Sequence, residues 1–284
     1  MLEHAWWVWV LILFIFTFFL GVLAVMGGIG GGVLFTPIVG SFFSFHLDFV
    51  RSAGLFVALT GSMVPASWIL KRGLANFRLT LPLALIASVG SIVGALIGLI
   101  IPTWITQTLL GVVTLFIAAL IVFSKRSEFP EVPKPDKISQ KLGIYGIYHD
   151  PSLNAVFEWW IHRTLPSLFL FFMIGIVAGM LGLGTGWANV PVLNVVMGCP
   201  LKIAAGTSKF LMSITDTSAA LVYLNSGSVL PLITVPSVLG IMLGSYVGIR
   251  LLARVNPKIV RVIIGAILVV AGVKSLLKGF GIWV

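Results

Sequence analysis

Two charged residues lie inside an apolar part of the chain, and they are well suited to chemistry. Lys209 and Asp216 fall in the apolar stretch 204–224. A charge in the hydrocarbon region of a bilayer costs at least about 2.5 kcal/mol, so such residues are functional candidates by default. Lys209 would neutralise a bound anion, and Asp216 would carry a coupling proton. The alternative is a structural pair satisfied by polar neighbours, although seven residues separate the two by about 10 Å along a regular helix.

Two glycine-rich segments interrupt apolar hairpins at matching positions. Residues 27–32 read GGIGGG and residues 182–186 read GLGTG. The apolar stretches that follow, 33–45 and 187–198, have 13 and 12 residues. As helices they reach roughly 18–20 Å, which falls short of the hydrocarbon thickness. We therefore expect both glycine breaks to lie inside the membrane, where irregular backbone survives only beside protein or a wet cavity.

The chemistry expected at these breaks is anion binding. A helix begins after each break and presents unpaired backbone N–H groups together with about half a positive charge. If the two halves are inverted, both helix N-termini face one site at the membrane midplane. The alternative is that the glycines only allow close helix packing, which we prefer for Gly90/Gly94 and for Gly244/Gly248. The predicted substrate-binding residues are Gly28, Gly30, Gly31, Gly32, Thr36, Gly182, Gly184, Thr185, Gly186, Asn189, Thr207, Ser208 and Lys209. The predicted proton-coupling residue is Asp216.

The composition places these residues in a membrane protein. Of the 284 residues, 59% are hydrophobic and 9% are charged, whereas a soluble domain is about a quarter charged. Ten apolar stretches use most of the chain, five before and five after a polar segment. The expected fold is an all-α polytopic membrane protein with two five-span repeats, whose Gly-broken hairpins are either re-entrant or full spans.

A repeat with an offset of 154 residues relates the two groups of spans. The offset pairs Gly28 with Gly182 and Pro37 with Pro191 without a gap. Because each half has five spans, the second half must enter the membrane from the opposite side, which is the inverted repeat typical of secondary transporters. The predicted domains are the first transmembrane repeat (1–124), a cytoplasmic linker (125–164) and the second transmembrane repeat (165–284).

The basic residues predict the orientation in the cell (plasma) membrane. Lys and Arg fall 14 on one side and 3 on the other, and the richer side should be cytoplasmic, with both termini outside. In the linker, Asp150 is a suitable N-cap and Pro151 suits the first helical turn. Apolar residues then follow at helical spacing. This pattern predicts a short amphipathic helix in the cytoplasmic interface, with a packed loop as the alternative.

The motifs resemble those of a known family. Residues 28–37 and 182–191 share the pattern Gly-x-Gly-x-Gly-x-x-x-x-Pro, and residues 205–208 read Ala-Gly-Thr-Ser. This combination resembles the TauE/SafE sulfite exporter family, also called DUF81, over nearly the whole chain apart from the linker. The resemblance implies outward transport of sulfur-containing anions such as sulfite, thiosulfate or an organosulfonate. The chain departs from the family pattern at residues 52–54, and at Lys209, where the family usually has an apolar residue.

The expected function is therefore secondary transport of a small sulfur-containing anion by a proton-coupled exporter. The expected partners are the anion and the lipid bilayer, and the sequence leaves a homo-oligomer open. The alternatives are an anion channel of the same architecture and a membrane-embedded enzyme or cofactor insertion factor. Cys199 is the single cysteine and the histidines fall at span ends or in loops, so we predict no catalytic residue, metal or cofactor. The net charge of +10 comes from short loops, so we predict no nucleic-acid partner.

Overall fold

The long apolar runs form helices, because in lipid every backbone N–H group must find its partner within the protein. The computed structural model describes residues 6–71, 73–123, 128, 130, 132, 134–150, 155–251 and 257–282. The first half contains α1 (Trp6–Gly27), α2 (Gly31–Phe42), α3 (Leu47–Lys71), α4 (Phe77–Ile100) and α5 (Thr103–Phe123). The linker contains α6 (Lys137–Lys141), β1 (Tyr145–Asp150) and β2 (Ala155–Trp160). The second half contains α7 (Thr164–Leu181), α8 (Gly186–Pro191), the π-helical turn η1 (Val192–Val196), α9 (Leu201–Asn225), α10 (Pro231–Leu251) and α11 (Pro257–Gly279).

The expectation of an all-α polytopic membrane protein is confirmed. Within the described ranges, seven helices are long and apolar enough to cross a membrane: α1, α3, α4, α5, α7, α10 and α11. Helix α2 has 12 residues, and α8 has 6 before the 5 residues of η1, so neither segment crosses the hydrocarbon as a helix. Helix α9 has 25 residues but carries charged and hydroxyl side chains along its length. The ten predicted stretches thus include two short broken limbs and one polar helix.

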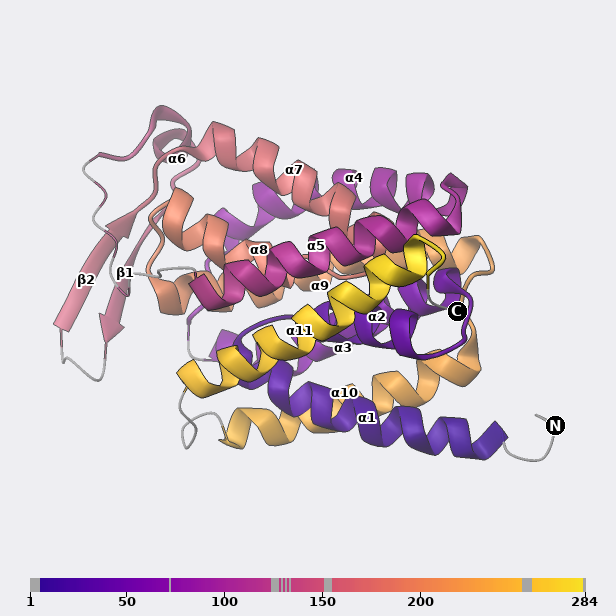
Figure 1. Cartoon of the computed structure of the whole chain (residues 1–284). Coiled ribbons are helices and arrows are strands. Elements are labelled where there is room, and N and C mark those ends of the chain that lie inside the picture. Colours follow the sequence, from indigo (N-terminus) through magenta and orange to yellow (C-terminus); the bar gives the residue numbers. More distant parts are fainter. Residues whose placement is uncertain are drawn as a thin grey trace.

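The helices recur with the 154-residue offset. Helices α3 and α9 begin at residues 47 and 201, α4 and α10 at 77 and 231, and α5 and α11 at 103 and 257. Helices α1 and α7, which open the two halves, run in opposite directions (Figure 1). This is the direction change that an inverted repeat requires. The relation of the halves by an axis in the membrane plane remains a prediction.

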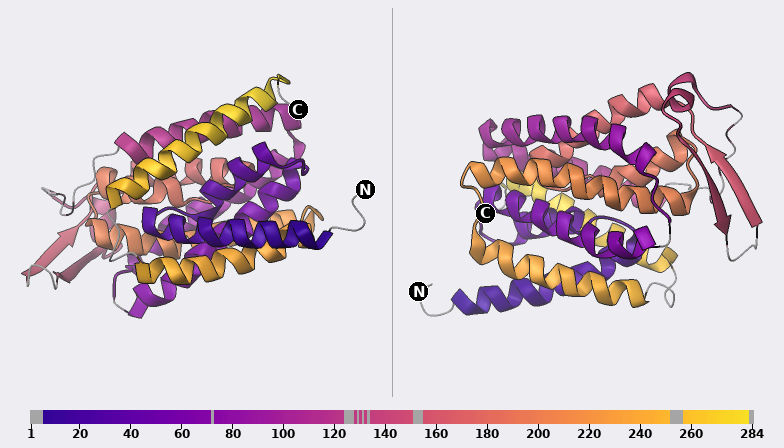
Figure 2. Two further views of the ribbon diagram at one scale, coloured as in Figure 1. Left: turned by 60° about the horizontal axis from the view of Figure 1, so that its bottom comes forward. Right: turned by 180° about the vertical axis from the view of Figure 1, so that it is seen from behind.

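Two pairs of closely packed helices each join one half to the other. Helix α1 packs along α10, as both views in Figure 2 show, and α4 packs along α7. A Cβ atom added at Gly90 would clash with the carbonyl of Phe172, and one added at Gly244 would clash with the carbonyl of Phe18. The two contacts are again 154 residues apart. The interpretation of these glycines as packing residues is therefore confirmed, since only glycine allows such close backbone approach.

The predicted interfacial helix in the linker is wrong, because the segment forms an antiparallel β-hairpin. Strand β1 pairs with β2 in a register that places Tyr145 opposite Trp160. Trp159 is buried while its neighbours Glu158 and Trp160 are exposed, which is the alternation of a strand. Aromatic and β-branched residues dominate both strands, and such residues favour strands over helices. The predicted N-terminal turn at Pro151 lies outside the described residues.

The linker is attached to the second half through Asp136. Its carboxylate accepts hydrogen bonds from the backbone N–H of Ser139 in α6 at 3.0 Å and from the backbone N–H of Thr164 in α7 at 2.8 Å. The Thr164 hydroxyl also donates to it at 2.9 Å. Burial raises the pKa of this carboxyl group, but the hydrogen bonds from Ser139 and Thr164 outweigh burial and leave the pKa below its ordinary value. Asp136 thus caps α6 and anchors the start of α7.

Candidate functional site

The two glycine breaks touch each other in the interior of the bundle. The first break joins α1 to α2, and Gly28 there has a φ of +69°. The second break joins α7 to α8, and Gly182 and Gly184 have φ of +69° and +71°, a backbone region that favours glycine. A Cβ atom added at Gly186 would lie 2.8 Å from the backbone nitrogen of Gly30. The backbones of the two breaks therefore lie against each other, as a site shared by both breaks requires.

Helix α2 is held against the second break by a hydrogen bond. The hydroxyl of Thr36 donates to the carbonyl oxygen of Gly182 at 2.6 Å, and both residues are buried. A Cβ atom added at Gly32 would lie 2.8 Å from the carbonyl oxygen of Leu183. Gly54 of α3 makes room for this junction, since an added Cβ there would reach the carbonyl oxygen of Gly182 at 2.5 Å. Thr36 is thus engaged in joining the two halves.

Helix α9 carries a cation to the first break. The side chain of Lys209 is buried, and its Nζ donates to the carbonyl oxygen of Ile29 at 3.0 Å. That carbonyl lies between Gly28 and Gly30, where the chain leaves helix α1 and the usual helical partners end. An ammonium group has three donors, and the carbonyl of Ile29 engages one of them. Lys209 therefore brings a positive charge directly to the broken backbone.

The same helix carries a carboxylate to the second break. One oxygen of Asp216 accepts hydrogen bonds from the backbone N–H of Thr185 at 3.2 Å and from its hydroxyl at 3.5 Å. The hydroxyl of Thr185 also accepts a hydrogen bond from the side-chain amide of Asn189 at 3.1 Å. Within the described residues, the other carboxylate oxygen of Asp216 and the amide oxygen of Asn189 are buried without a hydrogen-bond partner. Buried oxygens without a partner are costly in a protein interior, so a donor from a ligand would stabilise both.

The two charges do not form a direct pair. Among the described residues the ion pairs are those of Asp48 with Arg51 and with His46, so Lys209 and Asp216 do not meet within 4 Å. Each charge instead contacts a different break, as their spacing of two helical turns on one face allows. Helix α9 thus joins the two breaks through two charged side chains.

Met212 lies between these two charges on α9. A Cβ atom added at Gly30 would lie 2.5 Å from its Cε, and one added at Gly186 would lie 2.7 Å from its Sδ. Its thioether side chain therefore occupies the place where the two breaks face each other. Sequence reasoning missed this residue, because one methionine in an apolar stretch is an ordinary core residue. Its spacing of three and four residues from the two charges was the available signal.

Two of the predicted site residues contact other parts of the bundle instead. The hydroxyl of Thr207 accepts a hydrogen bond from the backbone N–H of Asn76 at 3.2 Å, before α4. Gly31 packs toward α10, since an added Cβ would lie 2.8 Å from Cδ1 of Ile241. Gly28 has open space around its Cβ position. Ser208 is buried on α9.

Arg51 is a second residue that the sequence interpretation missed. Its place just before the apolar run that starts at residue 53 predicts a loop charge, but Arg51 lies in α3 with 2% of its surface exposed. Its guanidinium donates to the carbonyl oxygens of Gly98 at 2.9 Å and Met180 at 3.1 Å, and it forms an ion pair with Asp48. The first two contacts lie near the C-terminal ends of α4 and α7, where cations are favoured. Arg51 thus fixes α7 just before the second break.

Comparisons with known proteins agree with this architecture. The family model described as sulfite exporter TauE/SafE matches residues 13–275. The probable membrane transporter protein MJ0441 of Methanocaldococcus jannaschii is 25% identical over 281 residues, covering 94% of this chain and 95% of that protein. The probable membrane transporter protein YunE of Bacillus subtilis is 23% identical over 118 residues, covering 42% of this chain and 43% of that protein. No solved structure matches the chain significantly. The chain therefore belongs to the TauE/SafE sulfite exporter family of membrane transporters.

Proposed function

We propose that the protein is a secondary transporter that exports a small sulfur-containing anion, such as sulfite, thiosulfate or an organosulfonate, across the cell membrane. The family to which the chain belongs supports this substrate class. The observation that carries the proposal is that α9 places Lys209 against the first break and Asp216 against the second. A movement of this one helix would change both breaks together, as a carrier with alternating access requires.

The anion would bind where the two breaks meet. Lys209 offers a buried positive charge, and the backbone N–H of Thr185 offers a donor at the start of α8. A bound oxyanion would replace the carbonyl oxygen of Ile29 as partner of the ammonium group. This exchange is favourable because hydrogen bonds between ionised groups are stronger than those to neutral ones. Met212 must move to admit the anion, and its unbranched side chain has the freedom to do so.

The proton would be coupled through Asp216. Its carboxylate holds the N–H of Thr185, which is a donor that the substrate anion needs. Two negative charges next to each other in a buried site repel strongly. Protonation of Asp216 removes this charge and releases the N–H to the substrate. The proton and the anion would therefore occupy the site together, and Lys209 would balance the remaining charge. Export would then follow the outward concentration gradient of the anion.

Uptake by proteoliposomes tests the proposal. The purified protein is reconstituted and given sulfite, thiosulfate, an organosulfonate, sulfate or chloride, with and without a pH gradient. We expect saturable flux of one of the sulfur anions, accelerated by the gradient. Asp216→Asn should lose the acceleration but retain anion binding, whereas Glu158→Gln, a change at an exposed carboxylate of β2, should behave as the unmodified protein. Gradient-driven flux with an unchanged pH dependence in Asp216→Asn would make Asp216 a structural residue.

The same assay separates the alternatives. An anion channel of this architecture would give flux without a fixed ratio of protons to anions. A membrane enzyme or cofactor insertion factor would need reactive or metal-binding groups, and in the described ranges His, Cys, Asp and Glu do not gather in groups of three or more. We propose that the protein is not an enzyme and that both termini lie outside the cell, as the distribution of basic residues supports.

A further inference from the structure

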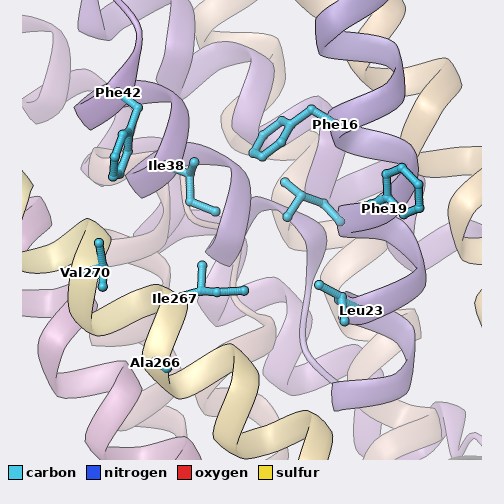
Figure 3. A pocket seen from close by; sticks show the side chains of 9 residues that line it. Phe16, Phe19, Leu23, Ile38, Phe42, Ala266, Ile267 and Val270 are labelled. Atoms are coloured by element: carbon cyan, nitrogen blue, oxygen red, sulfur yellow. The ribbon is translucent and has the colours of Figure 1, made fainter.

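An apolar groove of about 530 Å³ opens on the outer surface of the bundle between α1, α2 and α11 (Figure 3). This volume lies within the roughly 300–1,000 Å³ of small-molecule sites. Phe19 of α1 and Val270 of α11 line the groove, and both side chains are more than half exposed. Helices α1 and α11 are long and apolar enough to cross a membrane, so the groove opens toward the lipid.

Larger side chains stand at the equivalent positions of the other half. The 154-residue offset relates Val270 of α11 to Phe116 of α5 and Ala266 of α11 to Val112 of α5. Phe116 packs edge-on against Trp187 of α8, with ring centroids 6.3 Å apart. Smaller side chains at 266 and 270 leave the corresponding space between α11 and α2 open. The two halves thus differ in side-chain size at the positions that form this wall of the groove.

Two basic residues lie at one end of the groove. The Nζ of Lys274 lies 3.9 Å from the centre of the Phe42 ring, and Phe42 lines the groove. One turn further along α11, Lys278 donates to the carbonyl oxygen of Gly40 at 3.2 Å. The offset relates these lysines to Leu120 and Ser124 in the first half, and neither of those residues is charged. An apolar groove that ends at two cations complements a molecule with an apolar chain and an anionic head.

We propose that this groove binds an acyl chain of an anionic phospholipid, whose phosphate lies beside Lys274 and Lys278. The apolar walls exclude a polar ligand, since the lining atoms offer almost no hydrogen-bonding group to it. The basic end selects the headgroup, because lysines next to a membrane surface attract anionic lipids. Bound there, the lipid would bridge α1 and α2, the two helices joined by the first glycine break.

Lipid binding to the purified full-length protein tests this site. The protein is delipidated in detergent and titrated with phosphatidylglycerol or phosphatidylcholine of identical acyl chains, and bound lipids are counted by native mass spectrometry. The unmodified protein should bind one phosphatidylglycerol more tightly than phosphatidylcholine. The double variant Ala266→Val/Val270→Phe copies the residues of the other half, where they lie equally exposed on a folded helix. Its affinity for phosphatidylglycerol should fall by roughly tenfold or more, because an acyl chain that buries two fewer methylene groups in the groove binds weaker by about that factor.

The lysine variants test the headgroup separately. Lys274→Met and Lys278→Met should each lower the preference for phosphatidylglycerol by roughly fivefold and leave phosphatidylcholine binding unchanged. Leu85→Phe on α4, at a position 65% exposed, is the control for an aromatic ring added elsewhere on the lipid-facing surface. Equal lipid binding by the unmodified protein and the groove-filling variant overturns the proposal. So does conversion of a dimer to a monomer by that variant, because the occupant would then be a second copy of the chain.

Discussion

Gly30 and Gly186 lie where the two glycine breaks touch, and one added methyl group at either position probes that contact. At Gly30 the nearest atom to an added Cβ is the Cε of Met212 at 2.5 Å, and the nearest backbone atom is the Cα of Gly186 at 3.9 Å. At Gly186 the nearest atoms are the Sδ of Met212 at 2.7 Å and the backbone nitrogen of Gly30 at 2.8 Å. The first clash involves only a flexible side chain, whereas the second also involves rigid backbone.

These distances predict different costs for the two substitutions. Gly30 has φ −76° and ψ 145°, a conformation that alanine adopts without strain. Gly30→Ala should therefore cost less than about 1 kcal/mol, since Met212 moves aside and the unfolded chain loses some entropy. Gly186→Ala should cost about 1–3 kcal/mol, as overpacking of a rigid site does. Met212→Ala should relieve the clash at Gly30 but leave most of the clash at Gly186.

Double-mutant cycles measure this difference. The free energy of unfolding is obtained from SDS titration in mixed micelles for each glycine variant, with and without Met212→Ala. We expect the full cost of Gly30→Ala to disappear in the double variant and most of the cost of Gly186→Ala to remain. Anion flux in proteoliposomes should follow the same order. Equal costs for the two glycine variants, both cancelled by Met212→Ala, would show that the breaks do not meet through their backbones.

Four further outcomes follow from the structure. Lys209→Met should weaken anion binding, with a larger loss at low ionic strength where screening is least, as isothermal titration with sulfite can measure. Arg51→Met should lower the free energy of unfolding by about 1.5–3 kcal/mol, because the carbonyls of α4 and α7 lose a charged donor; a change below 0.5 kcal/mol, roughly the effect of a surface substitution, would contradict this role. Asp136→Asn should cost about 0.5–1.5 kcal/mol at neutral pH, because a neutral amide accepts hydrogen bonds from Ser139 and Thr164 more weakly than a carboxylate does. Because the pKa of Asp136 is lowered on folding, its contribution is complete above the unfolded pKa and is lost as the pH falls through the folded pKa. The difference between the two proteins should therefore vanish in acid, and a constant difference would refute the assignment. Cysteines at exposed Ser226 and Lys137 should react with an impermeant reagent from opposite sides of the membrane, Ser226→Cys from outside; the reverse would invert the proposed orientation.

The sequence alone determined the helical membrane fold, the 154-residue offset and the two glycine breaks. These features follow from local composition. The length of an apolar run decides whether a helix crosses lipid, and closely spaced glycines weaken a helix and readily adopt the positive φ found where α1 and α7 end. The family resemblance rests on the same motifs and is confirmed. The charges of Lys209 and Asp216 were found because a charge in an apolar run is conspicuous without any knowledge of its neighbours.

Only the tertiary structure decided which groups these residues contact. Composition cannot separate Met212 from other core residues, because its role comes from packing between two breaks that are distant in sequence. Arg51 next to a short loop reads as a solvated charge, and its burial depends on carbonyls that α4 and α7 bring together. The segment after Asp150 has apolar residues at helical spacing, but its aromatic residues pair with Tyr145 and its neighbours in a hairpin. In each case the decisive partner comes from another segment, so the periodicity of one segment carries no information about it.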